Sequence, residues 1–193
     1  MNNRFKLRLI AVTVAAMAVP MVAAGPGLAA QQLNGVFHIG SGSYIRMGLP
    51  NGGYFANPYS KDSNKTYTTI LSGVGGGIRT GVAQKAPSPA FSAHGNSLAN
   101  SIITPTSFTG IRFGVVTTVP PTFSLSGDKI TGYLRHLYAQ WNKQTFLQGN
   151  VVSGTYNGRT HAYSLSWATK VTSGPFVDYT GYWHLQGTFS PSR

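Results

Sequence analysis

The sequence predicts an all-β domain, built as an antiparallel β-sandwich or an up-and-down barrel with a long irregular N-terminal half. Its three acidic residues are all aspartate, so the strong helix former glutamate does not occur, whereas glycine occurs 24 times. In the C-terminal third, aromatic and aliphatic residues alternate with small polar ones, which is typical of half-buried antiparallel strands. These observations favour strands joined by turns over helices.

The first 30 residues have the three parts of a cleavable secretory signal. Three basic residues open the chain: Arg4, Lys6 and Arg8. An uncharged apolar run follows over 9–24, and small residues suited to a cleavage site complete the segment. The run is shorter than the roughly 20 residues that a membrane-spanning helix needs. We therefore expect residues 1–30 to be a signal peptide and residues 31–193 to form a single exported β domain, periplasmic or secreted, without a transmembrane helix.

Positive charge is the most unusual feature of the composition. The formal net charge of +12 falls to +9 when the three basic residues of the expected signal are removed. The remaining basic residues are spread singly along the chain. A field of this sign attracts polyanions and anionic surfaces, although positive charge also keeps an exported protein soluble. The chain contains no cysteine, so its core must form by packing alone.

The first part of the expected domain predicts a hairpin, a loop and a short strand. Within residues 33–48, Gly40-Ser41-Gly42-Ser43 separates two short apolar runs, which indicates a hairpin. Residues 49–65 are rich in turn-forming residues and predict a long irregular loop. Residues 66–71 are β-branched and aromatic, which indicates a strand.

The middle of the chain is predicted to hold a second loop, a short helix and a strand. Residues 72–89 contain a glycine run that partly mimics a phosphate-binding loop but lacks the following Lys-Ser/Thr, so we interpret it as an ordinary loop. The apolar spacing in 95–103 predicts one short helix, which ends before Pro105. Residues 108–119 predict a strand that ends at Pro120-Pro121.

The C-terminal third gives the clearest strand pattern. Residues 130–141 predict one strand, with these residues on one face: Tyr133, Arg135, Leu137 and Trp141. Residues 145–156 predict the next strand, and Asn157-Gly158 predicts a two-residue hairpin turn.

The last two predicted strands alternate most strictly. Residues 161–171 place these residues on one face: His161, Tyr163, Leu165 and Trp167. Gly174-Pro175 predicts a turn, and residues 179–189 predict the final strand. Its expected inward residues are Trp183, Leu185 and Phe189, and its expected outward residues are Tyr182, His184 and Gln186. Neighbouring strands joined by short turns form a meander.

The C-terminal residues also carry a recognisable pattern. Gly174-Pro175-Phe176 is followed by the run 179–187, and Gln140-Trp141-Asn142 precedes both, together with Phe146 and Gln148-Gly149. This pattern resembles the ending of small, uncharacterised exported bacterial proteins. The resemblance implies export and no particular activity.

Catalytic motifs are sparse. The acidic residues Asp62, Asp128 and Asp178 are far apart and lie beside turn residues, which disfavours a pair of catalytic carboxylates. The Gly-x-Ser-x-Gly nucleophile motif does not occur. A hydrolase that uses Asp178 or Asp128 with a histidine is one alternative, because geometry and not sequence order defines a catalytic triad. The five histidines are isolated in sequence, so we predict no metal and no cofactor.

The aromatic residues of the C-terminal strands give the best indication of function. Their ordinary role is core packing, but in a closed barrel such rings can line a ligand cavity, and in an outer-membrane barrel they form interface girdles. The candidate ligand-binding residues are Tyr133, Arg135, His136, His161, Tyr163, Trp167, Trp183 and His184. Of these, the three histidines would form a metal site only if their strand faces matched.

The sequence therefore predicts an exported, non-enzymatic β domain that binds something. The expected partner is an anionic surface or polyanion, such as an anionic cell-surface polymer, or a small apolar ligand. The alternatives are an Asp/His-dependent extracellular hydrolase and a small outer-membrane β-barrel. The sequence contains no specific nucleic-acid-binding motif, and it favours no oligomeric state.

Overall fold

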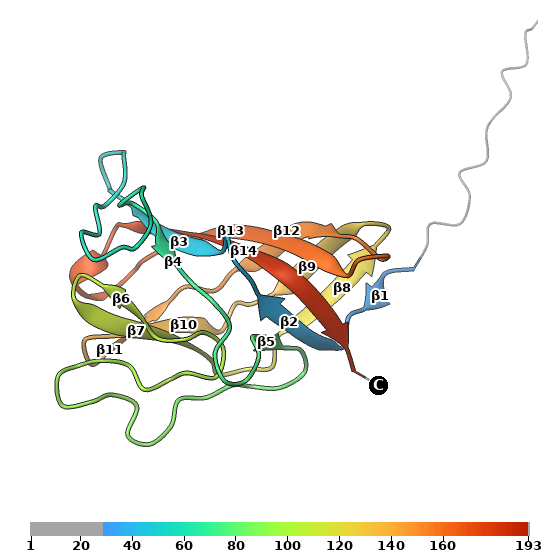
Figure 1. Ribbon diagram of the computed structural model, residues 1–193, viewed down its shortest axis with the longest axis horizontal. Helices are drawn as coiled ribbons and strands as arrows, with labels where there is room; N and C mark the ends of the chain where they lie inside the picture. The colour runs from blue at the N-terminus through green and yellow to red at the C-terminus, as the bar shows by residue number, and fades with distance from the viewer. Residues whose placement is uncertain (1–28, 193) are drawn as a thin grey trace, which may run out of the picture.

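The computed structural model describes residues 29–192, so most of the expected signal peptide lies outside the described residues. The described chain is all-β, as predicted: a large antiparallel sheet curls into a half-barrel and packs against a smaller second sheet (Figure 1). Within residues 29–192, no helix has the length and apolar character needed to cross a membrane.

The large sheet has ten strands in the order β1-β8-β9-β12-β13-β14-β2-β5, and β3 also pairs with β14 and with β4. The strands are β1 (Gln31–Gln32), β2 (Gly35–Ile39), β3 (Tyr44–Gly48), β4 (Thr68–Thr69), β5 (Ile78–Arg79), β8 (Thr122–Ser126), β9 (Lys129–Tyr133), β12 (Val151–Tyr156), β13 (Ala162–Lys170) and β14 (Thr180–Pro191). The long strand β14 lies at the centre of the pairing and contacts β13 along one side and both β2 and β3 along the other.

The second sheet has four strands in the order β11-β10-β7-β6. They are β6 (Thr106–Phe108), β7 (Ile111–Thr117), β10 (Leu137–Trp141) and β11 (Gln144–Leu147). A three-residue 3-10 turn, η1 (Gly174–Phe176), joins β13 to β14 at one end of the molecule. The long segments around β4 and β5 are irregular, which agrees with the predicted irregular N-terminal half.

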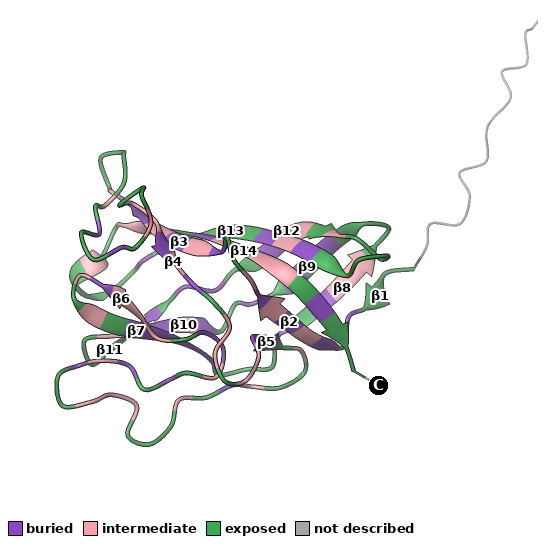
Figure 2. Ribbon diagram, viewed as in Figure 1, coloured by how far each residue is buried: buried purple, intermediate pink, exposed green. Residues whose placement is uncertain are grey.

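The core forms between the two sheets from residues at alternate positions (Figure 2). On β13 and β14 the predicted inward residues are buried: Tyr163, Leu165, Trp167, Trp183, Leu185 and Phe189. The rings of Trp167 and Trp183 stack with their centroids 5.4 Å apart. Both indole N–H groups donate to Gln148, one to its backbone carbonyl and one to its side-chain oxygen. The period-two burial predicted for these two strands is therefore confirmed from Tyr163 onward. His161, predicted on the same face as Tyr163, is exposed instead, because it precedes β13 and has a positive φ.

The predicted hairpin at Gly40-Ser41-Gly42-Ser43 is wrong. The two strands that it separates, β2 and β3, do not pair with each other but follow one another along the same edge of β14. Ser43 explains the interruption: its hydroxyl donates to the backbone carbonyl of Gln186 and accepts from the backbone N–H of the same residue. A side chain thus replaces the backbone pairing at this point, and the chain continues in the same direction.

The predicted short helix over 95–103 is also wrong. The backbone carbonyls of residues 100–102 accept hydrogen bonds from the N–H groups of residues 73–75, so this segment is bonded to the glycine run instead of forming a helix. A Cβ atom at Gly73 would lie 1.9 Å from the carbonyl oxygen of Asn100. The glycine run therefore permits a close approach of two backbones, which is a common reason for glycine in extended structure.

Residues 108–119 contain a turn that the prediction missed. Thr109-Gly110, both with positive φ, connects β6 to β7 as a two-residue hairpin turn, in which Phe108 pairs with Ile111. Conversely, the turn predicted at Asn157-Gly158 is a five-residue loop over 157–161. The side-chain oxygen of Asn157 accepts from two backbone N–H groups within that loop, and this bonding favours the longer connection.

Two predicted single strands each divide between the two sheets. Residues 130–141 form β9 in the large sheet and β10 in the second sheet, and buried Leu134 marks the crossing between them. The expected common face is therefore wrong, because Tyr133 is 53% exposed whereas Leu137 is 1% exposed. In the same way, residues 145–156 leave the second sheet after β11 and join the large sheet as β12.

The buried phenol of Tyr163 gives the fold a predicted sensitivity to alkali. Its hydroxyl donates to the backbone carbonyl of His38 at 3.0 Å, and burial raises its pKa above the ordinary value of 10.0. Above pH 10 the unfolded chain loses this proton while the folded chain keeps it, so stability present below pH 10 is lost as pH rises. We expect the free energy of unfolding to fall by up to about 1.4 kcal/mol per pH unit from this residue. Urea titrations between pH 9 and 11 should show a shallower fall for Tyr163→Phe, and equal slopes would contradict the assignment.

Candidate binding face

Three of the eight predicted ligand-binding residues belong to the core. Tyr163, Trp167 and Trp183 point between the sheets, and no more than 7% of any of them is exposed. Their polar atoms are already paired inside the protein, since the phenol bonds to His38 and both indoles bond to Gln148. These rings pack the interior and are not available on the surface.

The other five predicted residues lie on the surface in three separate places. Residues 133–136 mark the point where β9 leaves the large sheet, and there the Arg135 guanidinium carbon lies 5.9 Å from the centroid of the Tyr133 ring. His161 precedes β13, and its Nδ1 lies 2.5 Å from the hydroxyl of Tyr156. His184 faces outward in the middle of β14. The structure therefore does not bring the predicted residues together as one site.

The described residues form neither a metal site nor a pair of aspartate and histidine. In residues 29–192, no group of three His, Cys, Asp or Glu side chains is placed to hold a metal ion. Asp178 forms an exposed ion pair with Lys170, with 2.8 Å between Nζ and Oδ1. The histidine rings that form hydrogen bonds do so with hydroxyl, amide and carbonyl groups. This geometry gives no support to the hydrolase alternative.

The outer face of the large sheet carries a continuous row of polar side chains. Adjacent strands place one outward residue each in register, which we call the outer row: Thr69, Tyr44, His184, Ser166, Ser153, Thr131 and Ser124. All seven are exposed or half-buried. Five of them carry small hydroxyl side chains, which both donate and accept hydrogen bonds. The row therefore forms a low, hydroxyl-rich track across the strands.

Hydrogen bonds and stacking order the part of the outer row around His184. Nδ1 of His184 lies 3.0 Å from the hydroxyl of Ser166, and Nε2 lies 3.2 Å from the side-chain oxygen of Gln186. The imidazole packs beside the ring of Tyr44, with 5.4 Å between centroids. These contacts hold the imidazole in place on the sheet surface.

Arg46 lies on β3 beside the outer row and is surrounded by three tyrosine rings. Its guanidinium carbon lies 3.7 Å from the ring centroid of Tyr54, 5.2 Å from that of Tyr67 and 6.0 Å from that of Tyr182. These distances are within the range of cation–π attraction. We call these four residues the arginine cluster. The ring of Tyr67 also stacks on Tyr44, with 4.3 Å between centroids, so the cluster is continuous with the outer row.

The positive charge of the arginine cluster is not neutralised by a carboxylate of residues 29–192, where Lys170 and Asp178 form the single ion pair. The Nε atom of Arg46 is buried without a hydrogen-bond partner. Nη1 of Arg46 donates to the hydroxyl of Tyr67, which leaves the Tyr67 hydroxyl proton able to donate to another group. The cluster therefore combines an unpaired cation, aromatic faces and hydroxyl donors.

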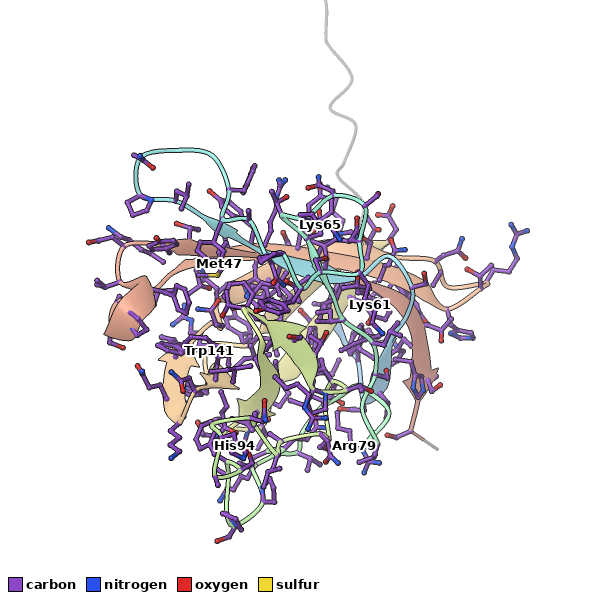
Figure 3. All side chains as sticks on the ribbon, turned by 60° about the vertical axis from the view of Figure 1, so that its left-hand side comes forward. Met47, Lys61, Lys65, Arg79, His94 and Trp141 are labelled. Atoms are coloured by element: carbon purple, nitrogen blue, oxygen red, sulfur yellow. The ribbon has the colours of Figure 1, made fainter. Side chains whose placement is uncertain are left out.

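A polar groove extends the outer row at the end where Thr69 lies. The groove has a volume of about 600 Å³, and Tyr44 and Thr69 of the outer row form part of its wall. Lys61 and Thr104 contribute a further cation and a further hydroxyl, and Asp62 contributes a carboxylate. Lys61, labelled in Figure 3, comes from the long loop between β3 and β4. Tyr54 belongs to the same loop. The track thus leads from the sheet surface into a hollow.

The sequence prediction identified only His184 among these residues. Tyr44 and Arg46 lie within residues 33–48, where the sequence predicts a hairpin that does not form, and Tyr54 lies in the predicted irregular loop over 49–65. The alternation Tyr44-Ile45-Arg46-Met47 could have indicated an outward aromatic–cation pair. The outer row takes one residue from each of seven strands, and a local sequence pattern does not show which strands lie side by side.

The comparisons with known proteins do not assign this site to a family. No protein-family description, no curated protein and no solved structure matches this chain.

Proposed function

We propose that this protein is an exported, non-enzymatic domain that binds an anionic, hydroxyl-rich polymer, such as an acidic cell-surface polysaccharide. The polymer would lie along the outer row, with one end at the arginine cluster. The observation that carries the proposal is the continuity between a hydroxyl track and an arginine without a carboxylate partner.

Each part of the face suits one part of such a ligand. The hydroxyls of the outer row can exchange hydrogen bonds with sugar hydroxyls. The exposed faces of Tyr54 and Tyr182, each 39% exposed, suit the apolar faces of sugar rings. Arg46 on β3 and the exposed Lys129 on β9 lie toward opposite ends of the outer row, and their charges attract acidic groups.

The dimensions of the face favour an extended ligand over a compact one. Four strand spacings separate β3 from β9, which corresponds to about 19 Å along the sheet at about 4.8 Å per spacing. Between these two strands the outer row consists of the His184 imidazole and the small side chains of Ser166 and Ser153. The positive net charge of the domain supports attraction of an acidic polymer from solution.

A negative charge within the outer row should weaken binding. We expect Thr131→Glu to reduce the affinity for polygalacturonate about tenfold, equivalent to ~1.4 kcal/mol, because its carboxylate would face the acidic polymer at close range. Biolayer interferometry with immobilised polygalacturonate measures this change, and neutral dextran serves as the reference surface.

The matched control is Thr145→Glu, which makes the same substitution at an exposed position of β11 in the second sheet. This variant should keep its affinity within about twofold. Binding by the wild-type protein should also weaken as the salt concentration rises from about 0.01 M to 0.15 M, because the screening length falls from about 30 Å to 8 Å. Equal losses in the two variants, or binding that ignores salt, would count against the outer row as the binding site.

A further inference from the structure

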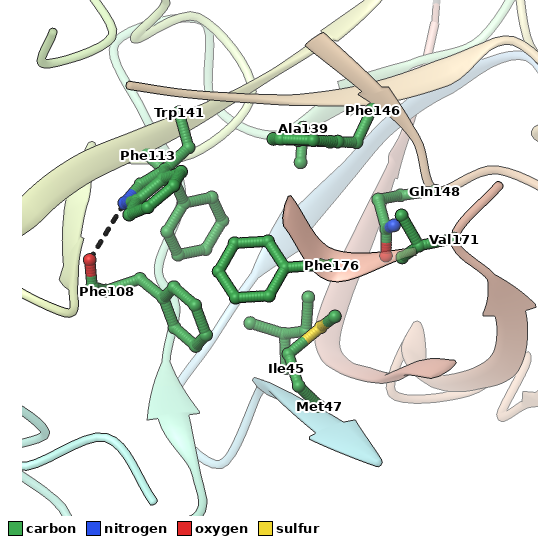
Figure 4. A pocket seen from close by; sticks show the side chains of 10 residues that line it. All are labelled: Ile45, Met47, Phe108, Phe113, Ala139, Trp141, Phe146, Gln148, Val171 and Phe176. Carbon is green, nitrogen blue, oxygen red and sulfur yellow. Dashed lines mark hydrogen bonds between the residues drawn. The ribbon is translucent and has the colours of Figure 1, made fainter. Parts of the chain in front are cut away.

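A small apolar cavity lies at the end of the molecule where β13 turns into β14, away from the middle of the outer row. Its volume is about 40 Å³. The walls come from both sheets and consist of apolar side chains, apart from Gln148 (Figure 4). One N–H of the Gln148 amide donates to the carbonyl of Leu147, and Oε1 accepts from the indole of Trp183. The cavity therefore offers an occupant at most one amide N–H.

The ring of Phe176 closes this cavity. It lies 5.3 Å from the ring of Trp141, 5.6 Å from Phe108 and 6.1 Å from Phe146, measured between centroids. Figure 4 shows the ring in the middle of the lining side chains. Since 40 Å³ is too small for an organic ligand, only movement of this ring would make room for one.

The segment that carries Phe176 is held by that ring, by the partly buried ring of Tyr179 beside Phe55, and by the exposed ion pair between Asp178 and Lys170. Its neighbours on η1 are exposed, and no residue of η1 is fully buried. The backbone hydrogen bonds of this segment have both donor and acceptor within residues 171–179. An outward movement of the segment therefore breaks no backbone hydrogen bond to another element. Gly174 and Asp178, both with positive φ, bound the turn. The ring can therefore leave without disrupting either sheet.

We infer that Phe176 is an internal plug, and that this cavity binds a compact apolar group, either one aromatic ring or a short hydrocarbon chain. The incoming group takes the place of the Phe176 ring against Trp141, Phe108 and Phe146. A charged or strongly polar group inside the cavity is disfavoured, because the lining offers it no more than one amide N–H. This site is separate from the proposed polymer-binding face and does not depend on it.

Removal of the plug should increase the affinity for a ring-sized probe. We expect toluene to bind the wild-type protein weakly and saturably, and to bind Phe176→Ala at least about tenfold more tightly, because the variant no longer has to expose a phenyl ring. Titrations followed by amide NMR shifts measure both affinities, and the shifts should concentrate at residues that line the cavity.

Ala139→Leu in the Phe176→Ala background provides the control, because leucine would fill the space from the opposite wall and should abolish toluene binding. Absence of binding to a cooperatively folded Phe176→Ala protein would overturn the inference. Binding to the variant but not to the wild-type protein would also overturn it, because the cavity would then be a product of the substitution. If the alanine variant does not fold, the wild-type titration alone decides: saturable shifts at the lining residues support the site, and their absence rejects it.

Discussion

Replacement of Phe37 by alanine is expected to lower the free energy of unfolding by about 3–5 kcal/mol, the range for large aromatic truncations in a core. Phe37 is fully buried on β2. Its ring centroid lies 4.4 Å from that of Phe123, 4.6 Å from that of Phe189 and 5.0 Å from that of Tyr163. These rings come from three further strands of the curled sheet, so the lost ring leaves a cavity that no single strand can close. Urea denaturation followed by circular dichroism measures the change.

The comparison for this prediction is Phe55→Ala. Phe55 is only partly buried and packs at the opposite end, beside Phe108, Phe176 and Tyr179. Phe55→Ala should lower the free energy of unfolding by less than Phe37→Ala does, because part of the Phe55 ring is already exposed to water. If Phe55→Ala destabilised the protein more than Phe37→Ala, the four-ring cluster around Phe37 would not be the main support of the half-barrel.

Gln148→Leu is expected to lower the free energy of unfolding by about 1–3 kcal/mol, despite the similar size of the two side chains. The Gln148 side chain is buried, and its oxygen accepts the indole N–H of Trp183 at 3.0 Å. Leucine would leave that N–H buried without an acceptor. A buried N–H without a partner destabilises the folded state, because it has lost its hydrogen bonds to water and gained none in return. Urea titration with tryptophan fluorescence as the signal measures the loss.

A double variant separates this hydrogen bond from packing. Trp183→Phe removes the donor, so Gln148→Leu should cost clearly less in that background than in the wild-type protein. Strict additivity of the two substitutions would show that the bond itself contributes little. The backbone carbonyl of Gln148 accepts from Trp167 and Thr169 and remains in every variant, which limits the comparison to the side chain.

Several strands could be predicted because their information is local. In β13 and β14, burial depends on which side of the pleat a residue occupies, and alternate positions carry either rings or small polar groups. The same alternation placed Tyr182, His184 and Gln186 on the outer face. The pattern could not show that residues 130–141 pass from one sheet to the other, because β9 and β10 both have strand-like sequences. The strands with which they pair decide the sheet to which each belongs: β9 pairs with β8 and β12, and β10 pairs with β7 and β11.

The candidate site shows the same limit. His184 could be found, because it is an outward residue on a well-predicted strand. The arginine cluster could not, because Arg46 meets Tyr182 through pairing of β3 with β14 and meets Tyr54 through a loop that folds back over β3. The sequence also predicts Trp167 and Trp183 as ligand-binding residues, which is wrong. Their aromatic character is visible in the sequence, but the sequence does not show that Gln148 accepts both indole N–H groups inside the core.

By itself, the sequence determined the all-β class, the positive charge and the inward or outward direction of side chains on its last two strands. Those properties follow from composition and from the two-residue repeat of an extended chain. Tertiary structure decided which strands are neighbours, and therefore the outer row, the arginine cluster and the cavity under Phe176. Each of these features joins residues that are distant in the chain, and their contacts form only when hydrogen bonding between strands fixes the register.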